Sequence, residues 1–139
     1  MKYFITENLN EKDLKIVHQF LTHTYWAKDR SFKKVLALHE NSTLSFGVKT
    51  QNGQAVGYAR VLSDLYHLGH IYDVFVLPEH RDKGLGKMIM KYILEHQKFQ
   101  KVAMWILQTR DAQFLYKKFG FKTFEHKTET MFLKTGKEI

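Results

Sequence analysis

The sequence predicts an α/β or α+β domain built around one mixed β-sheet, and three observations support this fold class. Short apolar runs typical of strands alternate along the chain with segments whose apolar residues recur at helical spacing. The Asn52-Gly53 pair between two of these runs is a strong hairpin signal. A clear amphipathic helix follows a strand of near-continuous apolar character, which suits a central strand covered on both faces.

Composition indicates a single globular domain. The 139 residues are 44% hydrophobic and 14% aromatic, which is enough apolar material to bury a core without disulfides or metals. The chain has one proline and no low-complexity stretch or repeat, so we expect one domain over residues 1–139. The absence of cysteine excludes disulfide frameworks, thiolate zinc sites, iron–sulfur clusters and cysteine nucleophiles.

The first half of the chain should form a strand, two helices and a hairpin. Residues 3–6 are a short opening strand, and Asn10 can cap a helix in which Asp13 bonds back to the cap. Ser31 caps a second, shorter helix. The apolar face of the first helix contains Leu14, Val17 and Leu21. The hairpin strands are residues 43–50 and 54–62.

The second half should alternate strands and helices. Residues 71–77 form an apolar strand closed by Pro78. From Gly84 onward, apolar residues recur at helical spacing and lysines occupy the opposite face, which indicates an amphipathic helix. Its apolar face contains Leu85, Met88, Ile89, Tyr92, Ile93 and His96. The remaining expected elements are strands at 101–107, 121–125 and 128–134 and a short helix at 111–118.

The connection between the apolar strand and the amphipathic helix carries the pattern with the clearest chemistry. Gly84 and Gly86 lie where the helix begins, so backbone N–H groups and the helix dipole can bind an anion there. Arg81, Lys83 and Lys87 add full positive charge around the same point. The spacing Arg-x-x-Gly-x-Gly is neither the Rossmann fingerprint nor a Walker loop. It predicts a pyrophosphate-binding loop; the alternative is a glycine turn with solvated basic residues.

Two motifs in this sequence resemble those of one enzyme family. The pattern Val-x-Pro-x-x-Arg-x-x-Gly-x-Gly at residues 76–86 resembles motif A of the Gcn5-related N-acetyltransferase (GNAT) superfamily. The stretch Ala-Gln-Phe-Leu-Tyr-Lys-Lys-Phe-Gly-Phe at residues 112–121 is similar to motif B of the same family. The resemblance implies the GNAT fold, which has a mixed, mostly antiparallel sheet with splayed central strands and about four flanking helices.

The resemblance also implies acetyl-CoA as cosubstrate. It places Phe75, Val76 and Leu77 along the pantetheine arm and gives the backbone N–H near Val76 the task of polarising the thioester carbonyl. Thr109 stands where many members carry an asparagine that contacts the cofactor. The residues implied around the pyrophosphate are Arg81, Asp82, Lys83, Gly84, Leu85, Gly86 and Lys87.

Catalysis requires an acid for the departing thiolate and a path for the proton of the amine. The resemblance implies Tyr116, the motif B tyrosine, as the acid; the alternative is an ordinary core aromatic. Asp73 interrupts the apolar central strand, and such a carboxylate is tolerated where it is functional or paired. We therefore expect Asp73 to be the general base or to pair with a basic residue, with Asp64 as second choice.

The resemblance points to the connection between the first two helices for the acceptor pocket. In that connection Tyr25 and Trp26 could stack on an acceptor, and Arg30 could bind its carboxylate or phosphate. Asp64, in the loop that precedes the central strand, is grouped with these substrate-binding candidates. The alternative is a core tryptophan followed by a solvated, charged turn.

The resemblance, together with the predicted pyrophosphate loop, implies an acetyl-CoA-dependent N-acetyltransferase. The acetyl group would pass to a primary amine of a small molecule or peptide by direct attack in a ternary complex, because the chain lacks a cysteine for a thioester intermediate. The alternatives are acetylation of an RNA-linked amine such as aminoacyl-tRNA, a non-catalytic nucleic-acid-binding module, and a non-catalytic acyl-CoA sensor. Eight histidines are present, but none has the spacing of a metal site, so we expect no metal.

The net charge of +8 favours an anionic partner. Residues 79–101 hold six basic and three acidic side chains, so part of the surplus surrounds the predicted pyrophosphate loop. Nucleic acid stays open as a partner without being favoured. No apolar run has the length of a spanning helix, which predicts a cytoplasmic protein without membrane contact, as a monomer or homodimer.

Overall fold

The structure is a computed structural model that describes residues 2–124 and 129–138. It divides into two compact units, Met1–Gln108 and Thr109–Ile139. The first unit contains a β-sheet and three α-helices, and the second contains one short α-helix. Within the described ranges, no helix is long and apolar enough to cross a lipid bilayer.

Five strands form one sheet in the order β1-β2-β3-β4-β5. The pairings β1–β2, β2–β3 and β3–β4 are antiparallel, and the pairing β4–β5 is parallel. The predicted mixed, mostly antiparallel sheet is therefore confirmed. The strands are β1 Tyr3–Thr6, β2 Leu44–Thr50, β3 Ala55–Ser63, β4 Leu68–Val76 and β5 Met104–Leu107.

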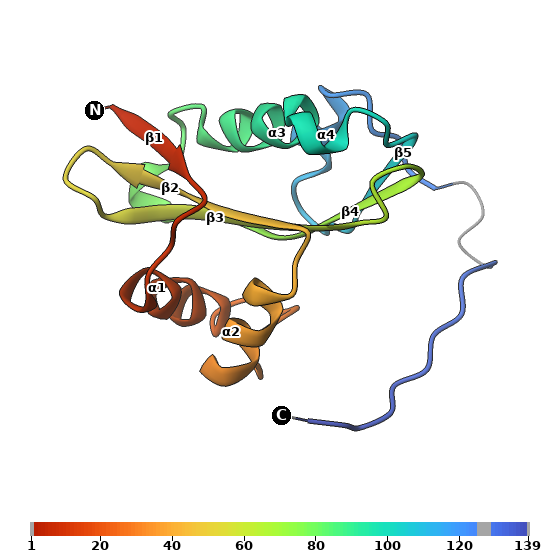
Figure 1. The fold of residues 1–139 in the computed structure, drawn as a ribbon, viewed down its shortest axis with the longest axis horizontal. Helices are drawn as coiled ribbons and strands as arrows, with labels where there is room; N and C mark the ends of the chain where they lie inside the picture. The colour runs from red at the N-terminus through yellow and green to blue at the C-terminus, as the bar shows by residue number, and fades with distance from the viewer. Residues whose placement is uncertain (1, 125–128, 139) are drawn as a thin grey trace. The chain divides into compact units, whose positions relative to one another are not determined.

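Helices α1 (Glu11–Leu21) and α2 (Phe32–Glu40) cover one face of the sheet, and α3 (Leu85–Glu95) covers the other (Figure 1). The predicted caps are confirmed. Asn10 accepts a hydrogen bond from the Asp13 backbone N–H at 2.9 Å, and the Asp13 carboxylate accepts one from the Asn10 N–H at 2.9 Å. Two short 3-10 helices, η1 (Pro78–His80) and η2 (Gln97–Phe99), flank α3 in sequence.

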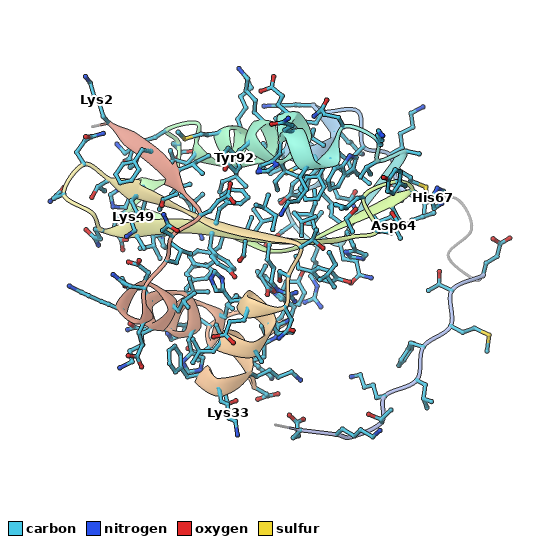
Figure 2. All side chains as sticks on the ribbon, in the orientation of Figure 1. Lys2, Lys33, Lys49, Asp64, His67 and Tyr92 are labelled. Atoms are coloured by element: carbon cyan, nitrogen blue, oxygen red, sulfur yellow. The ribbon has the colours of Figure 1, made fainter. Side chains whose placement is uncertain are left out.

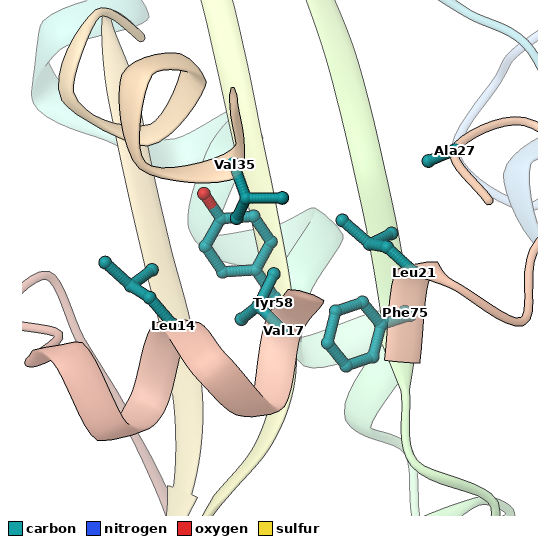
Figure 3. Close-up of a cluster of buried hydrophobic side chains, with 7 residues drawn as sticks. All are labelled: Leu14, Val17, Leu21, Ala27, Val35, Tyr58 and Phe75. Carbon is teal, nitrogen blue, oxygen red and sulfur yellow. The ribbon is translucent and has the colours of Figure 1, made fainter. Parts of the chain in front are cut away.

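The core beneath α1 and α2 holds β4 in place. Tyr58 of β3 and Phe75 of β4 are buried there against side chains from both helices (Figure 3). The Phe75 ring also stacks on Phe20 with 4.1 Å between ring centroids. The buried cluster consists of Leu14, Val17, Leu21, Ala27, Val35, Tyr58 and Phe75. Burial of side chains of this size contributes about 1.5–3 kcal/mol each, so this face fixes the position of β4.

The second unit differs from the sequence prediction. Its helix α4 spans Gln113–Lys117, inside the predicted range. The strands predicted at 121–125 and 128–134 are wrong for the described residues, because 121–124 and 129–134 contain no strand; Glu125 and Thr128 lie outside the described residues. An apolar run becomes a strand only where its backbone groups find a pairing partner. Side chains in this run stay exposed, at 92% for Met131 and 85% for Phe132.

A close contact between Gly69 and Trp105 gives the first prediction. The two residues are partners in the β4–β5 pairing, and a Cβ on Gly69 would overlap Cζ3 of Trp105. We expect Gly69→Ala to lower the free energy of unfolding by about 1–3 kcal/mol because the indole must move, as measured by urea denaturation. In a Trp105→Leu background the same change should cost much less; an equal loss in both backgrounds would contradict the packing argument.

Candidate active site

The site is organised by one extra residue in β4. Tyr58 of β3 pairs with Phe75, and Arg60 pairs with Tyr72, so between these pairs one residue of β3, Ala59, is opposed by two of β4. The extra residue falls at Asp73, whose φ is 56°, a left-handed conformation that is rare outside glycine. This β-bulge turns Tyr72 and Phe75 toward the same face, although their odd spacing would place them on opposite faces of a regular strand.

Beyond the bulge, β4 has one open edge. Its pairing with β5 ends at Ile71 and Leu107 in the described part of the chain, so residues 72–76 have no strand partner on that side. The Leu77 N–H donates to the Val56 carbonyl of β3 at 2.8 Å. Because successive residues in a strand direct their N–H groups to alternate sides, the Val76 N–H faces away from β3, toward the open edge. An open edge of β4 at this point agrees with the splayed central strands that the resemblance implies.

The loop that follows β4 is bent by two left-handed residues. Asp82 has φ 61° and Gly84 has φ 77°. Apart from Gly84 itself and its two chain neighbours, no residue has an atom within 4 Å of a Cβ built on Gly84, so its backbone conformation, and not crowding, favours glycine there. Arg81 Nε donates to the Val76 carbonyl at 3.0 Å, and the Tyr3 hydroxyl and His80 Nδ1 are hydrogen-bonded at 2.9 Å. These contacts tie the loop to β4 and to β1.

The start of α3 presents donors without an intrahelical acceptor. The first helical bond runs from the Met88 N–H to the Gly84 carbonyl at 3.0 Å, which leaves the N–H groups of the three preceding residues. Gly84, the N-cap residue, has no side chain to accept from them. The basic side chains predicted for this loop, Arg81, Lys83 and Lys87, are all exposed around it. The arrangement suits a phosphate group.

The other residues predicted along the cofactor divide between core and surface. The side chains of Phe75 and Leu85 are buried, so these residues offer a ligand only their backbone groups. Leu77 packs against the edge of the core cluster and is partly buried. Asp82 is exposed in the loop.

Four side chains from separate parts of the first unit meet at the bulge. Asp73 Oδ2 accepts hydrogen bonds from Arg60 Nε at 2.7 Å and from Arg30 Nη1 at 2.7 Å. Asp73 Oδ1 accepts from Trp26 Nε1 at 3.2 Å. The structure thus brings together three residues that the sequence singled out, Trp26, Arg30 and Asp73. It selects the paired state of Asp73 over a free carboxylate.

Arg60 is the member of this cluster that sequence reasoning missed. It lies in a run of buried residues on β3, and its side chain is only 5% exposed. A charged residue inside an apolar strand was the available signal, the same one that singled out Asp73. The guanidinium carbon of Arg60 also lies 4.6 Å from the centre of the Tyr72 ring.

Aromatic side chains flank the cluster. Tyr25 and Trp26 are 46% and 43% exposed and meet edge to face, with 5.1 Å between ring centroids. His70 stacks on Tyr72 at 4.1 Å, and burial lowers the pKa of its imidazole. The imidazole is therefore neutral near pH 7, so His70 adds no charge to the cluster.

Asp64 has a different place and a different task. It lies in the turn between β3 and β4 beside His67 (Figure 2). Its Oδ1 accepts backbone N–H groups from Tyr66, His67 and Leu68 at 3.1, 2.8 and 3.0 Å. These bonds lower the pKa of the Asp64 carboxyl, which makes it a weaker base. The geometry assigns Asp64 to the turn.

The second unit holds Thr109 and Tyr116. The Thr109 hydroxyl accepts the Ala112 N–H at 3.0 Å and so closes the turn before α4. Tyr116 lies on α4 and is 8% exposed. Burial, followed by the negative charge of Asp111, raises the pKa of the Tyr116 phenol to about 12. The phenol is therefore protonated at neutral pH, the state that a proton donor requires.

The Asp73 cluster gives the second prediction. Asp73→Asn leaves two largely buried guanidinium groups without a counter-charge, so we expect the free energy of unfolding to fall by about 3–5 kcal/mol in urea denaturation. The matched control is Asp64→Asn, because an amide oxygen can still accept the turn N–H groups. A similar shift of the urea midpoint in both variants would contradict the pairing role of Asp73.

Comparisons with known proteins agree with this geometry. The family model described as acetyltransferase (GNAT) domain matches residues 42–123. A crystal structure from Xanthomonas campestris pv. campestris, described as belonging to the GNAT family, is 32% identical, covers 97% of this chain and 94% of that one, and superposes with a TM-score of 0.87. The glucosamine-6-phosphate N-acetyltransferase of Arabidopsis thaliana shares the fold, with a TM-score of 0.68 at 18% identity over 99% and 100% of the two chains.

Curated relatives carry N-acetyltransferase names. The uncharacterised N-acetyltransferase ycf52 of Pyropia yezoensis is 29% identical over 83% of this chain, which spans 66% of that relative. A ycf52-like protein of Prochlorococcus marinus is 28% identical over 75% of this chain, which spans 59% of it. The chain thus spans less than two thirds of the length of these relatives. The matched domain model and the Xanthomonas structure show the family: this chain belongs to the GNAT acetyltransferases.

Proposed function

We propose that this protein is an N-acetyltransferase that uses acetyl-CoA and transfers the acetyl group directly to a primary amine. The observation that carries the proposal is the continuity of two features, the open edge of β4 and the uncapped start of α3. Backbone donors lie at both ends of the loop, the Val76 N–H at one end and the N–H groups in the first turn of α3 at the other, while the N–H groups of Leu77, His80 and Arg81 between them are bonded to carbonyls. A ligand with an amide-containing arm and a pyrophosphate matches these two ends.

The pyrophosphate would bind at the start of α3. The N–H groups of Leu85, Gly86 and Lys87 supply directed donors, and the helix dipole adds about half a positive charge. The exposed charges of Arg81 and Lys83 lie beside them. In the bound state, Arg81 would leave the Val76 carbonyl and turn to phosphate, which frees that carbonyl for the pantetheine arm.

The thioester would lie against the open edge of β4. There the Val76 N–H can donate to the carbonyl oxygen and stabilise the negative charge that develops as the amine attacks. A single positioned donor of this kind is worth about 2.7–4 kcal/mol in transition-state stabilisation. Because the donor belongs to the backbone, no side-chain pattern in the sequence reports it directly.

Asp73 fits a positioning role better than that of a base. Protonation of its carboxylate would leave Arg30 and Arg60 buried without a counter-charge, which is costly. We therefore assign Asp73 to orienting Arg30, Arg60 and Trp26, and the amine would lose its proton to water. Tyr116 would protonate the departing CoA thiolate, in line with its protonated state.

The third prediction tests cofactor binding. Acetyl-CoA at about 100 times its dissociation constant should stabilise the wild type by about 2.7 kcal/mol, seen as a rise in melting temperature. Gly86→Arg fills the start of α3 with a side chain and should abolish this rise. The control Gln97→Arg adds the same side chain at an exposed site after the other end of α3 and should keep it. An equal rise in both variants would exclude this loop as the binding site.

The fourth prediction tests the acid. Tyr116→Phe should lower kcat by about 10²–10⁴ and leave the melting-temperature rise with CoA intact. Tyr66→Phe, at a 67% exposed tyrosine, is the matched control. Because the Tyr116 pKa is raised to about 12, the phenol stays protonated near pH 10, and activity should show no loss from its deprotonation there. Activity is followed by thiol release; unchanged kcat in Tyr116→Phe would assign the residue to packing.

The acceptor is found by the same thiol-release assay. A panel of primary amines, amino acids, polyamines, peptides and aminoacyl-tRNA is offered with acetyl-CoA, and products are confirmed by a mass increase of one acetyl group. Binding of acetyl-CoA without turnover of any amine would favour a sensor over an enzyme. Salt-dependent RNA binding without stabilisation by acetyl-CoA would favour a nucleic-acid module.

A further inference from the structure

The cluster at the bulge carries more positive than negative charge. Two arginines meet one aspartate, while His70 is neutral near pH 7. The side chains of Arg60 and Asp73 are only 5% and 3% exposed, and that of Arg30 is 19% exposed. A surplus charge in such surroundings is costly unless an anion compensates it. The first unit therefore contains a largely buried cluster whose net positive charge one bound anion would neutralise.

The two arginines also have hydrogen-bond donors to spare. A guanidinium has five N–H donors in a planar fork. Among the described residues, Arg30 forms its side-chain hydrogen bond through Nη1 and Arg60 through Nε, both to the same oxygen of Asp73. The remaining nitrogens are available for a planar group that accepts two bonds at once, which is the geometry of a carboxylate.

The orientation of the cluster is fixed before a ligand arrives. Asp73 holds both guanidinium groups, and Arg60 additionally lies over the Tyr72 ring at 4.6 Å. Trp26 is bonded to the same carboxylate and keeps 43% of its surface exposed beside Tyr25. Preorganised donors and a fixed aromatic surface reduce the entropy that binding costs. These features are typical of a ligand site and not of a solvated turn.

The cluster lies close to the proposed reaction centre. Asp73 precedes Val76 by three residues on β4, a separation of about 10 Å along a strand. Arg30 and Arg60 both donate to Asp73 Oδ2, so a carboxylate bound by the two arginines would lie beside Asp73. A small molecule could therefore bind the arginines at one end and place its amine beside Val76 at the other.

We propose that the acceptor is a small aminocarboxylate, such as an amino acid, whose carboxylate is bound by Arg30 and Arg60 while its amine attacks the thioester. The inference rests on the proposed function, since it names the acceptor of that reaction. In the step itself, the amine nitrogen forms the new bond to the acetyl carbon as the carbon–sulfur bond breaks. The amine gives its proton to water, and the thiolate takes one from Tyr116. The products are an N-acetylated carboxylate and CoA.

The test compares acceptors that differ only in the carboxylate. Phenylalanine is paired with phenethylamine and 4-aminobutyrate with butylamine, and ethanolamine phosphate represents a phosphate-bearing amine. Thiol release should give a kcat/KM at least about tenfold higher for the carboxylate of one or more pairs, the effect of a charge-assisted hydrogen bond. Equal values within both pairs, or a preference for the phosphate-bearing amine, would overturn the proposal.

Substitutions test whether the arginines cause the preference for a carboxylate acceptor. Arg30→Met should raise the KM for the carboxylate acceptor at least about tenfold and leave the melting-temperature rise with acetyl-CoA unchanged. Lys28→Met, at an exposed lysine two residues earlier, is the matched control. Arg30→Lys keeps the charge but not the planar fork. It replaces Arg30→Met in the KM measurement if Arg30→Met does not fold. Equal KM values in the Arg30 and Lys28 variants would overturn the assignment.

A binding readout separates this inference from the proposed function. Saturation-transfer NMR with CoA present detects phenylalanine, phenethylamine, 4-aminobutyrate and butylamine without needing turnover. Carboxylate-selective binding that Arg30→Met removes would support the site even if no amine is acetylated. Acetylation of amines without a preference for carboxylates would support the proposed function and contradict the proposed carboxylate site.

Discussion

The bulge at Asp73 is the constraint on which the rest of the site depends. One extra residue in β4 turns Tyr72 and Phe75 toward the same face and places a carboxylate where Arg30, Arg60 and Trp26 can reach it. The left-handed backbone of Asp73 costs about 1–2 kcal/mol. Three hydrogen bonds to a charged group, worth about 1.5–3 kcal/mol each, can offset that cost. The strained residue therefore persists because its partners fix it from several directions.

The same interaction adds a polar tie between parts of the chain that also meet in the core. Trp26 and Arg30 lie in the connection between α1 and α2, and Arg60 lies on β3. Through Asp73, this connection is also bonded to β4, the strand that leads into the proposed pyrophosphate loop. Ala27 of the same connection is buried in the core cluster, so the core and the polar cluster hold the connection together. The proposed acceptor site is thus tied to the strand whose Val76 N–H is proposed to bind the thioester.

The sequence predicts the features that neighbouring residues determine, and it does not predict contacts between residues far apart in the chain. The capping box of Asn10 and Asp13, the hairpin and the helix that begins after Gly84 depend on neighbours in sequence, and the structure confirms them. Arg60 lies 13 positions from Asp73 in the sequence and Arg30 lies 43 positions away, so spacing could not identify them as its partners. Strands at 121–125 and 128–134 were predicted from apolar residues alone, but a strand also needs a partner, which local sequence does not supply.

The positive charge of this chain is used in two physically different ways. At the start of α3, backbone N–H groups and exposed, flexible side chains surround a point, an arrangement that accepts phosphate oxygens from many directions. At the bulge, two guanidinium planes are held by one carboxylate, an arrangement that selects the shape and orientation of its ligand. The first arrangement suits the proposed cosubstrate, and the second suits the proposed carboxylate of the acceptor. Under these two proposals, a change at Arg30 or Trp26 would alter acceptor binding while the loop and its backbone donors stay as they are.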